Sequence, residues 1–272
     1  MFTIIRHVST ARDTVRRYTT HTDVIAGTVA AHRAYILLHT SRSPRTFPSR
    51  VLSPVQLALR RHALKWNALV NFSWNPLVPV LQGRNDLSAE DNFEADSEVY
   101  DATVFADGHL PLHLASVSLH NIDSIANVIE DHLKSPEAVS EQQGAAADVH
   151  LLVCTHAARD CRCGERGPIL VDALNEEIRR RKVSVEMPPV TVGEVGHVGG
   201  HQYAANLLIF PHGDWLGHIQ PEDAPGVLDA ILDAPYIPHD NVRRPPLYGS
   251  HWRGRMGLSK EQQIQLFHRH AL

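Results

Sequence analysis

The sequence predicts an α/β protein with a mixed sheet, and three observations support this fold class. Residues 149–233 read as a strand, a helix, a strand, a hairpin and a second helix, an alternation typical of α/β folds. Residues 103–133 read as a hairpin followed by a helix. Hydrophobic residues make up 43% of the 272-residue chain, so a large core can form. No run of about 18 apolar residues occurs, so we expect no membrane span.

The N-terminal 50 residues differ in composition from the rest. Residues 1–65 carry eleven Lys and Arg residues but only two acidic ones, Asp13 and Asp23, although the whole chain has a net charge of −4. A basic, Ser/Thr-rich, acid-poor N-terminus is typical of a mitochondrial transit peptide, and a basic tail or a surface helix is the alternative. We therefore expect residues 1–50 to be a targeting and linker segment and the protein to be mitochondrial, in the matrix or the intermembrane space. The weak net charge argues against nucleic acid as the main partner.

The N-terminal half shows one helix signal, one hairpin and a second helix. Ser53 as N-cap and Pro54 at the first helical position predict a helix within Ser53–Leu69. The Asp107-Gly108 pair predicts the turn of a hairpin. The expected hairpin strands and the helix after them are Thr103–Ala106, Leu110–Val117 and Asn121–Leu133.

A polar stretch of small residues, Lys134–Asp148, predicts a domain boundary. We expect an N-terminal α/β half over 51–134, a linker over 135–148, a C-terminal domain over 149–258 and a tail over 259–272. The expected C-terminal elements are a strand at Val149–Val153, a helix at Pro168–Lys182, a hairpin of Asn206–Phe210 with Trp215–Ile219, a helix at Pro221–Asp233, and an extended Pro- and His-rich stretch ending in a short helix at Ser259–His268.

Two pairs of soft ligands stand in the C-terminal half. Eight residues separate Cys154 from Cys163, and three separate His197 from His201. Two thiolates and two imidazoles suit zinc or an iron–sulfur cluster. The wide cysteine spacing departs from a zinc finger, which has short spacings in both pairs, but a structural zinc site stays open as an alternative.

Cys161 competes with Cys163 for the ligand position. We favour Cys163 because Gly164 follows it and allows a tight turn, which leaves Cys161 as a free thiol or a small buried residue. A thioredoxin-type thiol–disulfide oxidoreductase would carry Cys-x-x-Cys, whereas this chain has Cys-x-Cys, so that activity is a weaker alternative. We expect His156 to be an ordinary loop residue.

These residues resemble those of a known family. The segments CTHAARDCRCGERGP and GHVGGHQYAANLLIFPHGDWLGHI are similar to the sucrase/ferredoxin-like family of thioredoxin-like [2Fe-2S] ferredoxins, and HWRGRMGLS resembles its altered-inheritance-of-mitochondria branch. The resemblance covers about residues 149–258. It implies a thioredoxin-like ferredoxin domain in the C-terminal half, and it leaves open whether the smaller N-terminal half is a degenerate thioredoxin-like domain.

The resemblance also implies a cofactor and its ligands. Carried over to this chain, a [2Fe-2S] cluster would be held by Cys154, Cys163, His197 and His201. Two neutral imidazoles in place of thiolates would raise the redox potential, as in Rieske centres. We expect an electron carrier or redox sensor, with a role in mitochondrial thiol or redox quality control and an unidentified redox protein as donor or acceptor, rather than an enzyme.

Overall fold

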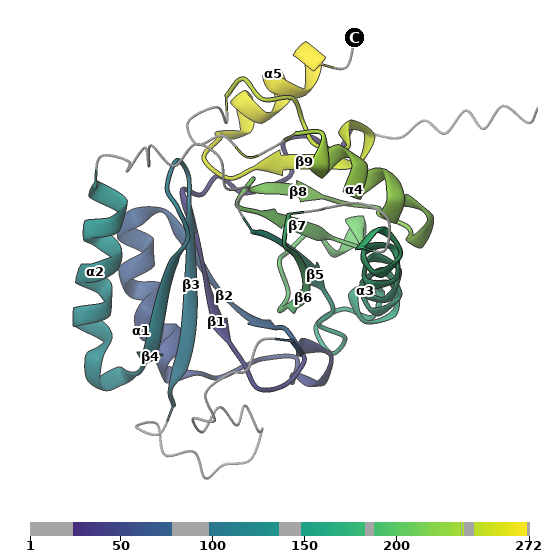
Figure 1. Ribbon diagram of the computed structural model, residues 1–272. Helices are drawn as coiled ribbons and strands as arrows, with labels where there is room; N and C mark the ends of the chain where they lie inside the picture. The colour runs from purple at the N-terminus through teal and green to yellow at the C-terminus, as the bar shows by residue number, and fades with distance from the viewer. Residues whose placement is uncertain are drawn as a thin grey trace, which may run out of the picture.

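The computed structural model describes residues 24–77, 98–135, 148–182, 188–234, 236 and 242–270 (Figure 1). The described residues form one mixed sheet of nine strands in the order β4-β3-β1-β2-β6-β5-β7-β8-β9. The predicted α/β class with a mixed sheet is confirmed. No helix within these ranges is long and apolar enough to cross a bilayer. The elements are β1 (Ala34–His39), α1 (Pro54–Ala63), β2 (Ala68–Trp74), β3 (Tyr100–Ala106), β4 (Leu112–Val117), α2 (Ile122–Lys134), β5 (Val149–Cys154), α3 (Cys161–Lys182), β6 (Val190–Val195), β7 (Leu207–Phe210), β8 (Asp214–Leu216), α4 (Ala224–Leu232), β9 (Trp252–Arg255) and α5 (Lys260–His270).

The two halves of the sheet have the same topology. In the first half, β1 and β2 are parallel, β3 is antiparallel to β1, and β4 is antiparallel to β3. In the second half, β5, β6, β7 and β8 repeat this pattern. Each half runs β-α-β-β-β-α, and its four strands lie in the order fourth-third-first-second, which is the strand order of the thioredoxin fold. The halves join through their second strands, β2 and β6, which pair antiparallel at Ser73–Val195 and Trp74–Glu194.

Side-chain alternation along the strands explains how the halves pack. In β1, Ile36 and Leu38 belong to the core beneath α1 and α2, whereas Leu37 points to the opposite face. That opposite face is covered by the other half, because Leu37 shares a buried cluster with Leu152 of β5. Across the same cluster the rings of Phe105 and Phe210 stack with centroids 4.3 Å apart. Figure 1 shows the result: helices lie on the outside of both half-sheets, and strands face strands between them.

Several predicted elements have the expected positions. α1 begins after Ser53, whose hydroxyl accepts a hydrogen bond from the Gln56 amide at 3.0 Å. The hairpin of β3 and β4 turns at residues 107–111, and α2 follows at Ile122.

Three segments differ from their predicted structure. Residues 34–39, assigned to the targeting and linker segment, form the buried strand β1. Residues 252–255, assigned to the extended stretch, form the edge strand β9. Helix α3 begins at Cys161, seven residues before the expected start at Pro168. Residues 1–23 of the expected targeting segment and residues 136–147 of the expected linker lie outside the described residues, so the division into domains stays a prediction.

A buried ionic network fixes β9 to β8. Asp214 is fully buried, and Arg255 and Arg244 contact its carboxylate at 2.9 Å and 3.0 Å. The indole of Trp252 donates to the same carboxylate. Burial alone would raise the pKa of Asp214, but the two guanidinium groups outweigh it and hold the pKa below its usual value. The position of β9 therefore depends on the negative charge of Asp214, which lies about forty residues earlier in the chain.

We predict that Arg255→Met destabilises the protein by about 3 kcal/mol, because it strips a buried carboxylate of its main partner. Urea unfolding monitored by circular dichroism measures the change. The control is Arg179→Met, which removes an exposed arginine and should change stability by less than about 0.5 kcal/mol. Equal effects of the two variants would contradict the role given to Asp214.

Candidate metal centre

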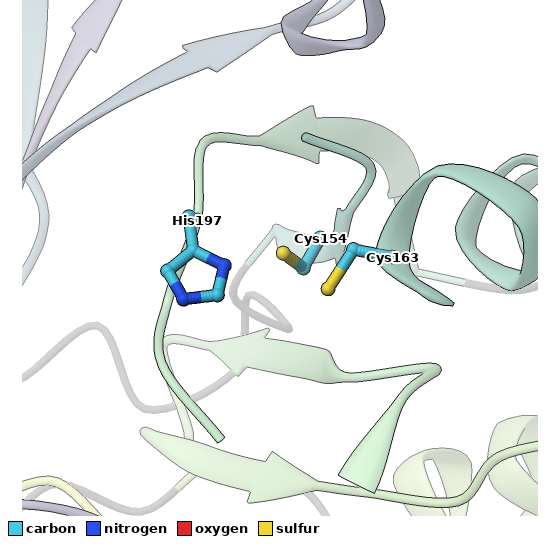
Figure 2. Close-up of side chains that lie close together, drawn as sticks. All are labelled: Cys154, Cys163 and His197. Carbon is cyan, nitrogen blue, oxygen red and sulfur yellow. The ribbon is translucent and has the colours of Figure 1, made fainter. Parts of the chain in front are cut away.

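The two predicted cysteine ligands meet where β5 ends and α3 begins. Cys154 is the last residue of β5, and Cys163 is the third residue of α3. Both side chains are fully buried. Figure 2 shows their sulfurs side by side below the turn that leaves β6. The sequence prediction placed Cys163 on a loop, and the structure instead places it in the first turn of a helix.

Two glycines allow the helix to approach the strand this closely. A Cβ on Gly167 would lie 2.4 Å from the carbonyl oxygen of Cys154. A Cβ on Gly164 would lie 2.4 Å from the Cβ of Ala157. Both distances are too short for any side chain. The glycine after Cys163 therefore serves close packing of α3 on the strand end, not the tight turn predicted from the sequence.

His197 completes a compact group with the two cysteines. It follows β6 by two residues, and one ligand atom from each of Cys154, Cys163 and His197 lies within 4.8 Å of the others. Its ring lies beside both sulfurs in Figure 2. The Nδ1 atom of His197 is buried and has no hydrogen-bond partner among the described residues. A buried imidazole nitrogen without a partner, next to two buried sulfurs, fits a soft metal or a metal cluster.

His201 lies next to this group but outside it. Its ring packs on that of His197, with centroids 5.7 Å apart and planes 29° apart. Its side chain is 47% exposed, and Nδ1 lies 3.6 Å from a carboxylate oxygen of Asp160. The structure thus brings three of the four predicted ligands together and leaves His201 at the solvent edge, so the four-ligand set stays a prediction.

Residues 25–247 match the family described as sucrase/ferredoxin-like. The chain belongs to this family. The match covers both halves of the sheet, so the family includes the N-terminal half as well as the half that carries the cysteines.

Curated relatives of the family match shorter stretches. The chain is 36% identical over 99 residues to altered inheritance of mitochondria protein 32 of Meyerozyma guilliermondii, covering 35% of this chain and 34% of the relative. The protein of that name from Debaryomyces hansenii is 40% identical over 87 residues, 30% of each chain. Actin patches distal protein 1 of Saccharomyces cerevisiae is 28% identical over 99 residues, 32% of this chain and 31% of the relative. Each match spans about a third of the relative's length.

Solved structures include a thioredoxin-like [2Fe-2S] ferredoxin from Aquifex aeolicus. It is 18% identical, with a TM-score of 0.27, and the match covers 32% of this chain and 86% of that chain. A likeness this slight carries no argument, so the fold assigned to this family member rests on its strand order and connectivity.

One residue that the sequence analysis set aside shapes the centre of this family member. His156 was expected to be an ordinary loop residue. Its ring is buried, and both of its nitrogens form hydrogen bonds. Its Nε2 donates to the carbonyl of Pro48 at 2.9 Å, which leaves Nδ1 to accept from the backbone N–H of His197 at 3.4 Å. His156 therefore fixes the backbone of the His197 loop.

A second residue that the sequence analysis did not identify, Glu194, connects the C-terminal ends of β5 and β6. Glu194 of β6 is buried and accepts from the hydroxyl of Thr155, the residue after Cys154, at 2.8 Å. Arg45 contacts the same carboxylate at 2.6 Å. Because Arg45 comes from a distant loop, no local pattern in the sequence points to this clamp.

The remaining sequence candidates lie on the surface. Cys161 is exposed, at the first residue of α3, with its side chain outside the compact group. Arg162 pairs with Asp160 at 3.0 Å and lowers the pKa of that carboxyl to about 2. Arg159 and Arg166 are exposed, so solvent screens their charge from the sulfurs.

The two buried sulfurs share one proton unequally. The pKa of Cys154 is held well below its usual value, chiefly because the Cys163 thiol donates a hydrogen bond to its thiolate. Burial opposes this effect, and His197 and the backbone amides of Val198 and His156 add to it. The pKa of Cys163 is raised, because its proton is held by the neighbouring thiolate. Deprotonation of this pair therefore begins at Cys154.

We predict that Gly167→Ala destabilises the protein by about 1–3 kcal/mol, because the new methyl group must displace the Cys154 carbonyl or the helix. Thermal and urea unfolding measure the effect. Gly249→Ala is the matched control, since a Cβ there would meet no atom within 4 Å. A Gly167→Ala protein as stable as the Gly249→Ala protein would refute the close-packing argument.

We predict that Cys163→Ala raises the pKa of Cys154 in the metal-free protein, because the thiolate loses its strongest hydrogen bond. Thiolate absorbance in the ultraviolet should then appear at higher pH than in the unsubstituted protein. Cys161→Ser, which changes the exposed thiol, should leave this titration step in place. An unshifted step in Cys163→Ala would contradict the shared-proton arrangement.

Proposed function

We propose that this protein binds a [2Fe-2S] cluster and works as a one-electron carrier or redox sensor. The observation that carries the proposal is the buried group of Cys154, Cys163 and His197, in which the His197 Nδ1 has no partner. Such a donor set suits soft metals, and a site this dry would strengthen each metal–ligand bond. His201 would supply the fourth ligand, with its ring turned away from Asp160.

The surroundings of the sulfurs agree with an iron–sulfur cluster. Backbone N–H groups of Val198 and His156 donate to the Cys154 sulfur, and donors of this kind are one of the ways proteins tune iron–sulfur potentials. The family description includes ferredoxin-like proteins, which agrees with the same cofactor. A bound cluster would supply reversible uptake of one electron at the iron atoms.

The half-exposed His201 supports transfer to another protein. A ligand at the solvent edge would bring the centre within short range of a docked redox partner, while the cysteines stay shielded from water. A role in mitochondria agrees with the names of the relatives in Meyerozyma guilliermondii and Debaryomyces hansenii. Within mitochondria, the proposed role is thiol or redox quality control. The donor and acceptor would be one-electron redox proteins.

A thiol–disulfide oxidoreductase has less support. The exposed Cys161 and the buried Cys163 are two residues apart at the start of α3. The buried Cys163 side chain faces Cys154 instead, so a thioredoxin-type pair of one exposed and one resolving thiol is not formed by Cys161 and Cys163.

We predict that protein reconstituted anaerobically with iron and sulfide holds two of each per chain, absorbs visible light and gives an electron paramagnetic resonance signal after reduction. His197→Ala and His201→Ala should each lose most of the cluster, and His197→Cys and His201→Cys should keep it with a changed signal. His218→Ala, an exposed histidine near the centre, is the control and should keep the cluster unchanged. A colourless protein that retains only zinc would overturn the proposal.

A further inference from the structure

Arg253 of β9 is a buried cation that the sequence analysis did not single out. Its side chain is 2% exposed. Its guanidinium donates from Nη1 to Asn206 Oδ1 at 2.7 Å, and from Nε and Nη2 to the hydroxyl and carbonyl of Thr28, each at 3.2 Å. The ring of Tyr203 lies under it, 4.7 Å from the guanidinium carbon. Every one of these partners is neutral.

A buried guanidinium without a carboxylate is costly. Among the described residues no Asp or Glu lies within ion-pair distance of Arg253, whereas its neighbours in β9 are held by Asp214. Stacking on Tyr203 and hydrogen bonds to neutral groups recover only part of the lost hydration. Burial lowers the pKa of Arg253 to about 10, so the side chain remains charged at neutral pH. A buried positive charge is stabilised most effectively by a negative charge close to it.

Asn206 links Arg253 to the candidate metal centre, because its side chain accepts a hydrogen bond from Arg253 and its carbonyl accepts one from the Cys154 amide at 3.1 Å. Burial is the largest effect on the pKa of Arg253 and lowers it, whereas Tyr203, Cys154 and Cys163 act in the opposite direction when ionised. The guanidinium also lies against the ligand loop, since a Cβ on Gly200 would come within 2.2 Å of its Nη2. Gly200 directly precedes His201. Any side chain at residue 200 would clash with the guanidinium of Arg253, so Arg253 can lie against this loop only because residue 200 is glycine.

We propose that Arg253 is the buried counter-charge of the Cys154, Cys163 and His197 centre and a positioning residue that favours its reduced state. This inference rests on the proposed cluster. With two thiolates and two neutral imidazoles as ligands, an oxidised [2Fe-2S] centre is neutral overall. One electron from a reductant converts one ferric ion to ferrous, breaks no bond and leaves one negative charge. Arg253 stabilises that charge from a position that water does not screen.

Exposed arginines near the centre act differently. The charge of Arg166 lies in water, where counter-ions weaken it, although its Nη1 donates to the Ala204 carbonyl at 2.9 Å. Arg253 is buried, so dissolved ions cannot approach its charge and screen it. Its effect on the centre should therefore persist at high ionic strength, whereas any effect of Arg166 should fade.

The test is the midpoint potential of the loaded protein, titrated with dithionite and followed by visible absorbance. Arg253→Met should keep iron and sulfide but shift the equilibrium toward the oxidised state by about tenfold or more, which is about 59 mV for one electron. Arg253→Lys, which keeps the charge, should recover most of the shift. Arg166→Gln is the control and should change the potential far less, and the Arg253→Met difference should remain in high salt.

A second variant guards against loss of folding in Arg253→Met. Asn206→Asp places a carboxylate against the Arg253 guanidinium and should lower the potential in the same direction, because the charge is then neutralised locally. Equal potentials in Arg253→Met, Asn206→Asp and the unsubstituted protein would overturn the inference, as would equal shifts in Arg253→Met and Arg253→Lys. Absence of iron and sulfide from the unsubstituted protein would instead overturn the proposed cluster itself.

Discussion

The contact on which the centre depends is the close approach of α3 to the end of β5. Gly164 and Gly167 remove the side chains that would hold the helix away, and the sulfur of Cys163 then comes to rest against that of Cys154. Because the two sulfurs lie side by side and are buried, the pKa of Cys154 is lowered and that of Cys163 is raised. A bound metal would take the place of the shared proton, so the packing that brings the two sulfurs together would also favour the binding that we propose.

The two halves of the sheet show what the centre requires beyond the fold. Both have the same connectivity, and His39 ends β1 where Cys154 ends β5. His39 is bonded on both ring nitrogens, to Ser73 at 2.9 Å and to Thr103 at 2.8 Å, and burial lowers its pKa to about 4. It borders a cavity of about 390 Å³ whose wall also includes His113 and His150 but none of the three cysteines. The thioredoxin-like frame therefore does not by itself make a soft-metal site; one half supplies the ligands, and the other covers them.

The sequence predicted the parts of this protein whose physics is local. The Ser53 cap and the Asp107-Gly108 turn both depend on neighbours in the chain, and the structure has both. The choice of Cys163 over Cys161 as a ligand stays a prediction, and the structure buries Cys163 and exposes Cys161. Strand β1 was not predicted because its apolar run is short and lies in a basic segment. Strand β9 was lost because WRGR does not look like a buried strand: Arg255 is accommodated only by Asp214, about forty positions earlier. Long-range ion pairs leave no pattern in a window of the sequence.

The same reasoning separates the roles of the arginines near the centre. Arg159, Arg162 and Arg166 stand next to the cysteines in the sequence. In the folded chain Arg162 is neutralised by Asp160, and Arg159 and Arg166 face water. Arg253 is about ninety residues from Cys163, yet it is the one enclosed with it. Separation along the chain does not determine how strongly an arginine acts on the centre. The strength depends on the distance in space and on the effective dielectric constant between the two charges, which is low for buried groups. In the function that we propose, a buried cation with only neutral hydrogen-bond partners would stabilise the negative charge that the centre gains on reduction.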